Sequence, residues 1–276
     1  MSECFSKFYI KNGQLVAQQN FENEDMSKDK NVYEVIRIVN GIPLFMSQHM
    51  DRLRNSVKLV NKIMLEAPSQ IASEIERLIA KEKVDQGNVK LIFNYGKTEN
   101  VYLFFIKHSY PTQDMYRNGV NTILYHGERE NPNAKVVSLD FRRKVNDKIA
   151  EKKVYEAILV DNNGFITEGS RSNIFMLLDK KIITAPLETV LPGVTRSVVI
   201  DIINSKKFEF AEEKLHYSDI EKLDGLFITG TSPQILPINK VDDQLFSSAE
   251  NSLVKELMKG YEQKMTEDLK NYKANS

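Results

Sequence analysis

The 276-residue sequence contains one cysteine, no tryptophan and four histidines. The single cysteine, Cys4, cannot form a disulfide within the chain. The histidines are scattered, at positions 49, 108, 126 and 216, so the sequence offers no cluster of ligands for a structural metal ion. We therefore expect neither a disulfide framework nor a metal site.

Excess charge of one sign and long hydrophobic runs are also missing. Lysine plus arginine and aspartate plus glutamate number 38 each, so no overall charge would attract nucleic acid or an anionic membrane surface. No stretch reaches the roughly 18 uncharged apolar residues of a membrane-spanning helix, and the first residues lack a basic segment followed by an apolar run. We expect a cytoplasmic protein with neither nucleic acid nor a membrane as partner.

The residues that are present are ordinary for a globular protein, with 41% hydrophobic and 28% charged. Domains typically contain about 100 to 200 residues, so the length predicts two. Residues 108–118 include Pro111 and show no apolar period, which favours a domain boundary there. We expect a small N-terminal domain over residues 1–115 and a larger C-terminal domain over residues 119–276.

Two Asn-Gly pairs predict hairpins in the N-terminal part. Asn12-Gly13 joins two short apolar runs within residues 7–16, and Asn40-Gly41 follows an alternating strand at 32–39. Such pairs readily adopt the positive φ angles of a type I′ turn. Ser47 is expected to cap the amphipathic helix that follows, because its hydroxyl can accept a bond from an orphan backbone N–H.

The C-terminal part is predicted to be strand-rich, so the whole chain is expected to have an α/β (α+β) fold. Apolar runs separated by polar turns predict strands, and several other segments have helical character. The expected strands include residues 120–126, 157–160 and the run ending in Thr229, and the expected helices lie at 147–155, 195–204 and 248–272.

The segment LPGVTR, Leu191 to Arg196, places a glycine before a helix expected to start at Thr195. Free backbone N–H groups and the positive end of a helix dipole suit a phosphate. An ordinary helix entry explains the same residues, since Pro-Gly before a helix is common. Thr231 and Ser232 follow a buried strand and can supply hydroxyls and amides to the same phosphate, or form a plain turn.

Two charged residues suit a cofactor that carries a basic ring nitrogen. Glu168 ends a predicted strand, where site residues are common, and a carboxylate beside a pyridine nitrogen would favour its protonated form. Lys135 carries the amine that imine chemistry needs. Taken singly, a glutamate such as Glu168 is more often solvated, and Lys135 is one of 38 basic residues.

The order of several motifs resembles that of the class IV aminotransferases, the fold-type IV pyridoxal phosphate enzymes. This family includes branched-chain aminotransferases, D-amino acid transaminases and aminodeoxychorismate lyases. The similarity extends from Val32 to Pro237. It is carried, in order, by YEVIR, NG, HMDRLRNS, RENPNAK, YEAIL, ITEGSRSNIF, LPGVTR and ITGTS.

The resemblance implies a role for each matching residue. Lys135 would be the Schiff-base lysine for pyridoxal 5′-phosphate, and Glu168 would bind the pyridine nitrogen. Tyr33 and Arg37 match substrate-pocket positions. The phosphate would be bound by Arg52, the amides of Val194 and Thr195, and Thr231 with Ser232. The resemblance further implies the D-amino acid aminotransferase-like fold, with the cofactor between a small and a larger domain, and a homodimer.

The sequence departs from the family in three places. Asp29, Lys30 and Asn31 stand where the family usually has a Gly-Asp-Gly-like run. Ser138 is the nearest substitute for the tyrosine or asparagine that the family places near the phenolic oxygen. Tyr95 falls where D-amino acid transaminases carry a carboxylate-binding arginine.

We therefore expect transfer of an amino group between an amino acid, of an apolar or branched-chain L type, and a 2-keto acid. Aminodeoxychorismate lyase activity, which releases pyruvate, and D-amino acid transamination are the alternatives within the family. Outside it, a binding protein that has lost the reaction and an unrelated phosphate-binding module remain open.

Overall fold

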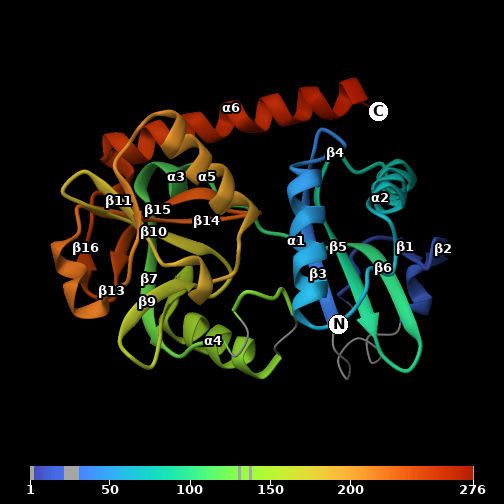
Figure 1. Ribbon diagram of the computed structural model, residues 1–276, viewed down its shortest axis with the longest axis horizontal. Coiled ribbons are helices and arrows are strands. Elements are labelled where there is room, and N and C mark those ends of the chain that lie inside the picture. The colour runs from blue at the N-terminus through green and yellow to red at the C-terminus, as the bar shows by residue number, and fades with distance from the viewer. Residues whose placement is uncertain (1–2, 22–30, 130–131, 137–138, 276) are drawn as a thin grey trace. The chain divides into compact units, whose positions relative to one another are not determined.

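A computed structural model describes residues 3–21, 31–129, 132–136 and 139–275. The chain divides into two compact units (Figure 1). Unit 1 comprises Met1–Ser109, Ala134–Val137 and Met265–Ser276, and unit 2 comprises Tyr110–Asn133 and Ser138–Lys264. The domain limits expected from the sequence, 1–115 and 119–276, remain a prediction. Asp29, Lys30 and Ser138 lie outside the described residues.

Unit 1 is built on an antiparallel six-stranded sheet in the order β2-β1-β6-β5-β3-β4. Its elements are β1 (Phe8–Lys11), β2 (Gln14–Ala17), β3 (Asn31–Val39), β4 (Ile42–Pro43), α1 (Met46–Leu59), α2 (Pro68–Glu82), β5 (Gln86–Tyr95) and β6 (Glu99–Ile106). Both predicted hairpins are confirmed. The turn residues Asn12 (φ 47°), Gly13 (φ 76°), Asn40 (φ 53°) and Gly41 (φ 71°) have the left-handed backbone that Asn-Gly pairs favour.

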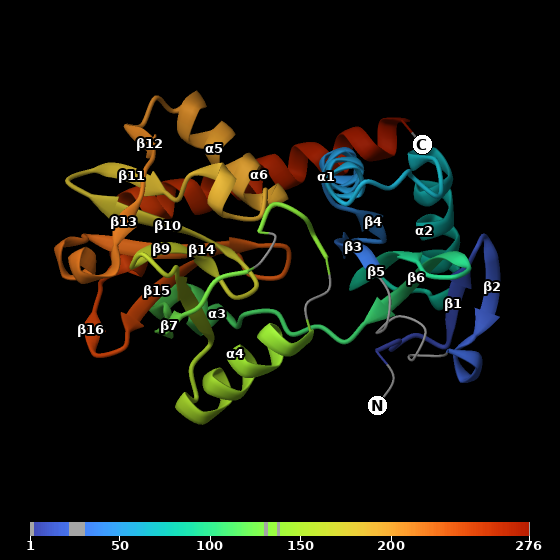
Figure 2. The same cartoon turned by 60° about the horizontal axis from the view of Figure 1, so that its bottom comes forward.

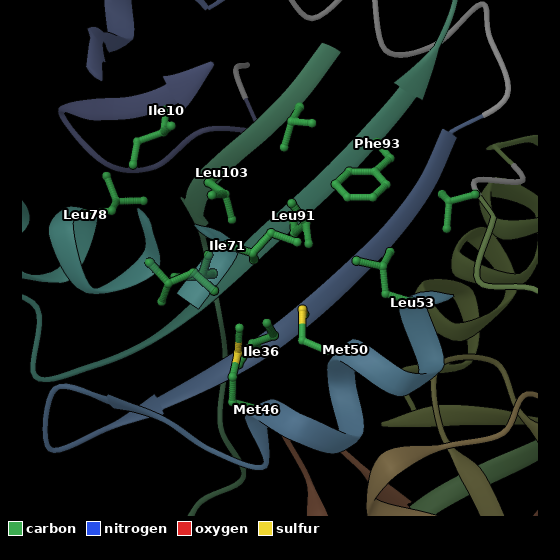
Figure 3. Packing of buried hydrophobic residues seen from close by; sticks show 14 of the residues in the cluster. Ile10, Ile36, Met46, Met50, Leu53, Ile71, Leu78, Leu91, Phe93 and Leu103 are labelled. Carbon is green, nitrogen blue, oxygen red and sulfur yellow. The ribbon is translucent and has the colours of Figure 1, made fainter. Parts of the chain in front are cut away.

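Strand β3 presents alternate residues to the two faces of this sheet, as its pleat requires. Val32, Ile36 and Ile38 belong to a core that also contains buried side chains of α1 and α2. Figure 3 shows Met46, Met50 and Leu53 of α1 pointing into this core, and Figure 2 shows both helices on the same side of the sheet. Tyr33 belongs instead to a second, aromatic cluster on the other face, with Tyr9, Ile92, Tyr102 and Phe104.

The start of α1 differs from the sequence prediction. Ser47 does not cap the helix, because α1 already begins at Met46 and its N-cap residue is Phe45, in the left-handed region at φ 53° and ψ 41°. The side chain of Phe45 is buried. No side chain of the N-cap residue closes the helix.

Unit 2 contains a ten-stranded sheet in the order β12-β11-β10-β14-β15-β7-β8-β9-β13, with β16 beside β15. A pairing between Glu168 of β9 and Asn173 of β10 joins the two branches, so that β10, β14, β15, β7, β8 and β9 form a closed ring. The strands are β7 (Val120–His126), β8 (Glu156–Val160), β9 (Phe165–Gly169), β10 (Asn173–Leu178), β11 (Lys181–Thr184), β12 (Phe210–Glu212), β13 (Leu215–His216), β14 (Gly225–Gly230), β15 (Gln234–Val241) and β16 (Gln244–Leu245).

The helices of unit 2 are α3 (Gln113–Asn118), α4 (Leu139–Lys152), α5 (Val194–Ser205) and the first part of α6 (Ser252–Asn275). Strand β8 is buried on both faces. Ile158 and Val160 face one core, whereas Ala157 and Leu159 pack with Val145 of α4. Figure 2 shows α4 and α5 on opposite sides of the sheet. The mixture of helices and strands confirms the predicted α/β (α+β) class.

The sequence prediction did not include α3. It placed the start of α4 too late and the start of α6 too early. Thr112 caps α3 by accepting a bond from the amide of Met115 at 3.3 Å, a local signal within the segment read as a boundary. Helix α4 starts at Leu139 rather than 147. Of the helices in the described ranges, none is both long enough and apolar enough to cross a membrane.

Candidate active site

Lys135 lies in a short segment of unit 1 that runs beside the start of β3. Its amide donates to the hydroxyl of Ser56 on α1 at 3.3 Å, and its carbonyl accepts from the amide of Tyr33 at 3.0 Å. Val136 forms an isolated antiparallel bridge with Val32. The ammonium Nζ of Lys135 lies 4.9 Å from the centre of the Tyr33 ring. The main chain of Lys135 is therefore held on both sides, and its side chain lies against an aromatic face.

Arg52 is engaged in a buried ion pair with Glu34 of β3. Its Nε donates to Oε1 of Glu34 at 2.8 Å, and its Nη2 donates to Oε2 at 2.6 Å. Nδ1 of His49 lies 2.8 Å from the same Oε2. Glu34 is fully buried, and His49 and Arg52 are 3% and 8% exposed. Bidentate pairing of this kind fixes the orientation of a guanidinium.

Charge and burial set the protonation of this cluster. Burial raises the pKa of Glu34, but the charge and bonds of Arg52 and the bond with His49 outweigh it, so the pKa lies well below its usual range. Burial lowers the pKa of His49 despite the opposing effect of Glu34, and the positive charges of Arg52 and Lys135 lower it further. Glu34 is therefore an anion that Arg52 balances.

The three predicted substrate residues are divided between the two faces of the sheet. Tyr33 and Arg37 alternate with Glu34 along β3 and belong to the same face. Tyr95 instead packs in the core beneath the helices, and its hydroxyl donates to the carbonyl of Ile63 at 2.7 Å. The structure thus places Tyr33 and Arg37 on one face and Tyr95 on the other.

Glu168 ends strand β9 of unit 2 and is 2% exposed. Its Oε2 accepts from the amide of Leu191 at 3.1 Å and from Nδ2 of Asn173 at 3.5 Å. Its Oε1 lies 3.3 Å from Nε of Arg129, whose Nη2 donates to the carbonyl of Ser170 at 2.9 Å. A buried carboxylate is stable only when it is paired and hydrogen-bonded, and both conditions are met here.

The loop between β9 and β10 is fixed by a second buried carboxylate. Oε1 of Glu156 accepts from the amide of Arg171 at 2.5 Å and from the hydroxyl of Ser170 at 3.3 Å. Burial raises the pKa of Glu156, opposed by these bonds. Gly169 leaves room for these groups, since an added Cβ would displace the hydroxyl of Ser172 and the Glu156 carboxylate.

Arg52 lies on α1 of unit 1, whereas the other predicted phosphate-binding residues lie in unit 2, around the start of α5 and the end of β14. Gly193 is the N-cap residue of α5 and has no side chain with which to cap the helix. An added Cβ at Gly193 would lie 2.0 Å from Oδ1 of Asn173. Val194 and Thr195, the first two helical residues, are buried, and Thr231 and Ser232 lie in the turn between β14 and β15.

Sequence reasoning did not assign roles to Arg129 and Asn173, although both lie in motifs that carry the resemblance. Arg129 opens RENPNAK, and Asn173 lies within EGSRSNIF. Asn173 also donates to the carbonyl of Leu191 at 2.8 Å, which ties strand β10 to the segment before α5. Only the placement of these side chains beside Glu168 reveals their contribution.

Comparison with known families agrees with the resemblance. Residues 31–241 match the family described as amino-transferase class IV, which covers more than half of the chain. The chain therefore belongs to the class IV aminotransferases, and it is an enzyme that uses pyridoxal 5′-phosphate, the cofactor of that family.

Individual relatives differ in substrate. The chain is 25% identical over 253 residues to a D-alanine aminotransferase of Bacillus licheniformis, covering 86% of this chain and 89% of the relative. It is 30% identical over 249 residues to a protein of Methanocaldococcus jannaschii named "Putative branched-chain-amino-acid aminotransferase", covering 84% and 85%. The structure of the branched-chain aminotransferase of the archaeon Thermoproteus uzoniensis with norvaline superposes with a TM-score of 0.85 at 19% identity, covering 97% of both chains.

The residues of unit 2 fit the chemistry of this cofactor. Glu168 is a buried carboxylate that would suit a ring nitrogen, and the start of α5 would offer the amides that a phosphate prefers. The hydroxyl of Thr229, at the end of β14, is buried with no hydrogen-bond partner among the described residues. An orphaned buried hydroxyl next to these groups is consistent with a polar ligand at this end of the sheet.

Proposed function

We propose that this enzyme transfers an amino group between an apolar or branched-chain L-amino acid and a 2-keto acid, with Lys135 as the residue that carries the cofactor. The observation that supports Lys135 is its anchoring through two main-chain bonds, with its ammonium against Tyr33. When bound, pyridoxal 5′-phosphate supplies the electron-withdrawing ring that makes the α-proton of an amino acid removable.

Lys135 has two roles in this proposal. Its amine holds the cofactor between turnovers, and once displaced by the amino acid it accepts the α-proton and later returns it. A base must lie at a fixed distance from the proton that it removes, and the main-chain bonds to Ser56 and Tyr33 provide that constraint.

Glu168 would hold the proton on the ring nitrogen through a charge-assisted hydrogen bond. The adjacent Arg129 and the amide of Leu191 hold its carboxylate in a fixed orientation. Phosphate would be bound by Arg52, by the amides of Val194 and Thr195, and by the hydroxyls of Thr231 and Ser232.

The substrate preference rests on Tyr33 and Arg37 as lining residues and on Tyr95 in place of an arginine. Without that arginine, the substrate carboxylate would bind to the backbone amides of Thr231 and Ser232 through charge-assisted bonds. Tyr95 itself would contribute no ligand, because it lies in the core on the other face of the sheet from Tyr33 and its hydroxyl is bonded to the carbonyl of Ile63. Arg37 would bind the side-chain carboxylate of an acidic co-substrate such as glutamate or 2-oxoglutarate.

D-amino acid transamination is the second candidate, favoured by the similarity to the D-alanine aminotransferase of B. licheniformis. Release of pyruvate from aminodeoxychorismate is the further alternative implied by the family. We also propose that the enzyme works as a cytoplasmic homodimer. Sedimentation at concentrations from nanomolar to micromolar would test that state.

The function is tested by reducing the purified enzyme with borohydride and mapping the modified lysine. We expect the cofactor on Lys135 and no attachment after Lys135→Ala. Lys148→Ala is the matched control, because Lys148 is a surface lysine paired with Glu151 on α4. Attachment that persists in Lys135→Ala would refute the assignment.

Substrates are then compared by following the visible spectrum with a panel of amino donors. We expect L-leucine, L-isoleucine and L-valine to convert the bound cofactor faster than D-alanine or D-glutamate. Faster conversion by the D-amino acids would establish the second candidate, and pyruvate release without a keto acid acceptor would establish the lyase.

A further inference from the structure

The N-cap residue of α1 is hydrogen-bonded to a residue that is distant in the sequence. The amide of its N-cap residue, Phe45, donates to Oδ2 of Asp268 on α6 at 2.7 Å, across 223 residues of sequence. The carbonyl of Phe45 accepts the first helical bond, from the amide of His49, at 3.1 Å. Asp268 thus acts on the same turn of helix from which His49 projects.

Asp268 and Tyr272 lie one turn apart in the last part of α6, which belongs to unit 1. Asp268 is half-buried, and burial raises its pKa while the bond from Phe45 lowers it. The hydroxyl of Tyr272 donates to Glu76 of α2 at 2.7 Å, and its ring packs against the core beneath both helices. The end of α6 is therefore attached to α1 through Asp268 and to α2 through Tyr272.

Helix α1 connects this attachment to Lys135. His49, Arg52 and Ser56 recur at spacings of three and four residues, so they lie along one side of the helix. His49 and Arg52 bind Glu34, and the hydroxyl of Ser56 accepts from the amide of Lys135. A negatively charged side chain at the start of a helix stabilises that turn.

We propose that Asp268 is a positioning residue for the aminotransferase reaction, which fixes the first turn of α1 and thereby the side chains that hold Glu34 and Lys135. The proposal rests on the function proposed for Lys135. Asp268 lies beyond residues 31–241, which match the family, so the role belongs to a segment outside that match.

The structural half of the proposal is tested by amide hydrogen exchange in the wild-type protein and three variants. In Asp268→Ala, we expect the amides of residues 45–49 to exchange about 5-fold faster, the change that loss of a typical helix cap produces. Asp268→Asn retains an acceptor oxygen and should stay within about 2-fold of wild type. Tyr272→Phe, the matched control, should leave residues 45–49 unchanged, because Tyr272 bonds to α2.

The functional half is tested by steady-state kinetics on the cofactor-loaded enzymes. We expect Asp268→Ala to lower kcat about 10-fold with a much smaller change in KM, since a misplaced base slows the proton transfer more than it weakens binding. Asp268→Asn should restore kcat. Wild-type kcat in Asp268→Ala, or unchanged exchange at residues 45–49, overturns the proposal.

The experiments remain decisive if a variant fails to fold, and they separate this inference from the proposed function. If Asp268→Ala does not fold, Asp268→Leu, which has a similar size and no acceptor oxygen, takes its place in both measurements with the same expected and contradicting results. If wild-type enzyme lacks transaminase activity while Asp268→Ala still accelerates exchange, the proposed function fails and only the capping contact stands.

Discussion

Arg129 and Glu168 form an ion pair in which Nε of the arginine lies 3.3 Å from Oε1 of the glutamate, whose side chain is 3% exposed. The pair lies where β9 ends, next to the amide of Leu191, which donates to the other carboxylate oxygen. Glu168 therefore has a cation on one oxygen and backbone and side-chain donors on the other.

Removing the cation should destabilise the fold. We expect Arg129→Leu to lower the free energy of unfolding by about 3 kcal/mol, because a buried carboxylate is left without its charge partner. Urea unfolding measures the change. The double variant Arg129→Leu with Glu168→Gln should recover most of the loss, and an equal loss in both variants would show that Arg129 acts through packing instead.

Replacing the carboxylate should separate cofactor binding from turnover. We expect Glu168→Gln to bind pyridoxal 5′-phosphate with little change in affinity but to lose about 100-fold in kcat, since an amide cannot hold a proton on the ring nitrogen by charge. Cofactor titration and steady-state kinetics measure the two effects. Turnover at the parent rate would make Glu168 a residue of loop structure alone.

Arg52 should contribute to folding as well as to cofactor binding, because it balances the buried Glu34. We expect Arg52→Ala to cost about 3 kcal/mol of stability and to weaken cofactor affinity. Arg54→Ala is the control on the same helix, since its exposed pair with Asp51 should contribute less than about 1 kcal/mol.

The two roles of Arg52 can be separated by removing the charge that it balances. Arg52→Ala combined with Glu34→Gln should recover stability while the cofactor affinity stays low. Recovery of affinity together with stability would exclude direct binding of the phosphate by Arg52.

Glu66 should make stability depend on pH. Burial and the neighbouring Glu74 raise the pKa of Glu66 to about 7, above its ordinary value of 4.5. The folded state thus holds a proton that the unfolded state loses first, and stability falls as the pH rises from about 4.5 to about 7. Since Glu66 is half-exposed, we expect a loss of about 1 to 2 kcal/mol.

Unfolding of wild type and Glu66→Gln at several pH values measures this effect. The difference in stability between them should grow across the same interval, in favour of the variant, and then stay constant. Parallel pH profiles for the two proteins would show that the pKa of Glu66 is not raised on folding.

The sequence predicted those parts of the fold that depend on neighbouring residues. Asn-Gly turns and the alternation of β3 are local, because the backbone preference of Asn-Gly and the pleat act over a few residues. The predicted start of α1 was wrong, since the helix begins at Met46 after Phe45, whose amide donates to Asp268, a residue distant in sequence. No local pattern reports such a contact.

The candidate site shows the same division. Family motifs made Lys135 and Glu168 candidates, a prediction that stands, but Arg129, within a quoted motif, had no predicted role, and only the structure places its guanidinium beside Glu168. The bidentate pairing of Arg52 with Glu34 was also unforeseen, because charge pairing across a strand and a helix depends on tertiary packing. The side of the sheet on which Tyr95 lies also depends on tertiary structure, because it is set by the register of β5 against its neighbouring strand β6.

The alternation along β3 also limits how the length of this strand can change. Tyr33 lies on one face of the sheet, and Glu34 lies on the other, where it meets Arg52. Insertion or deletion of a single residue before Tyr33 that shifts the strand would exchange their faces, leaving a carboxylate among aromatic rings and Arg52 without its anion. Changes of length in this strand should therefore be tolerated far less than substitutions at its partly buried positions Val35 and Val39.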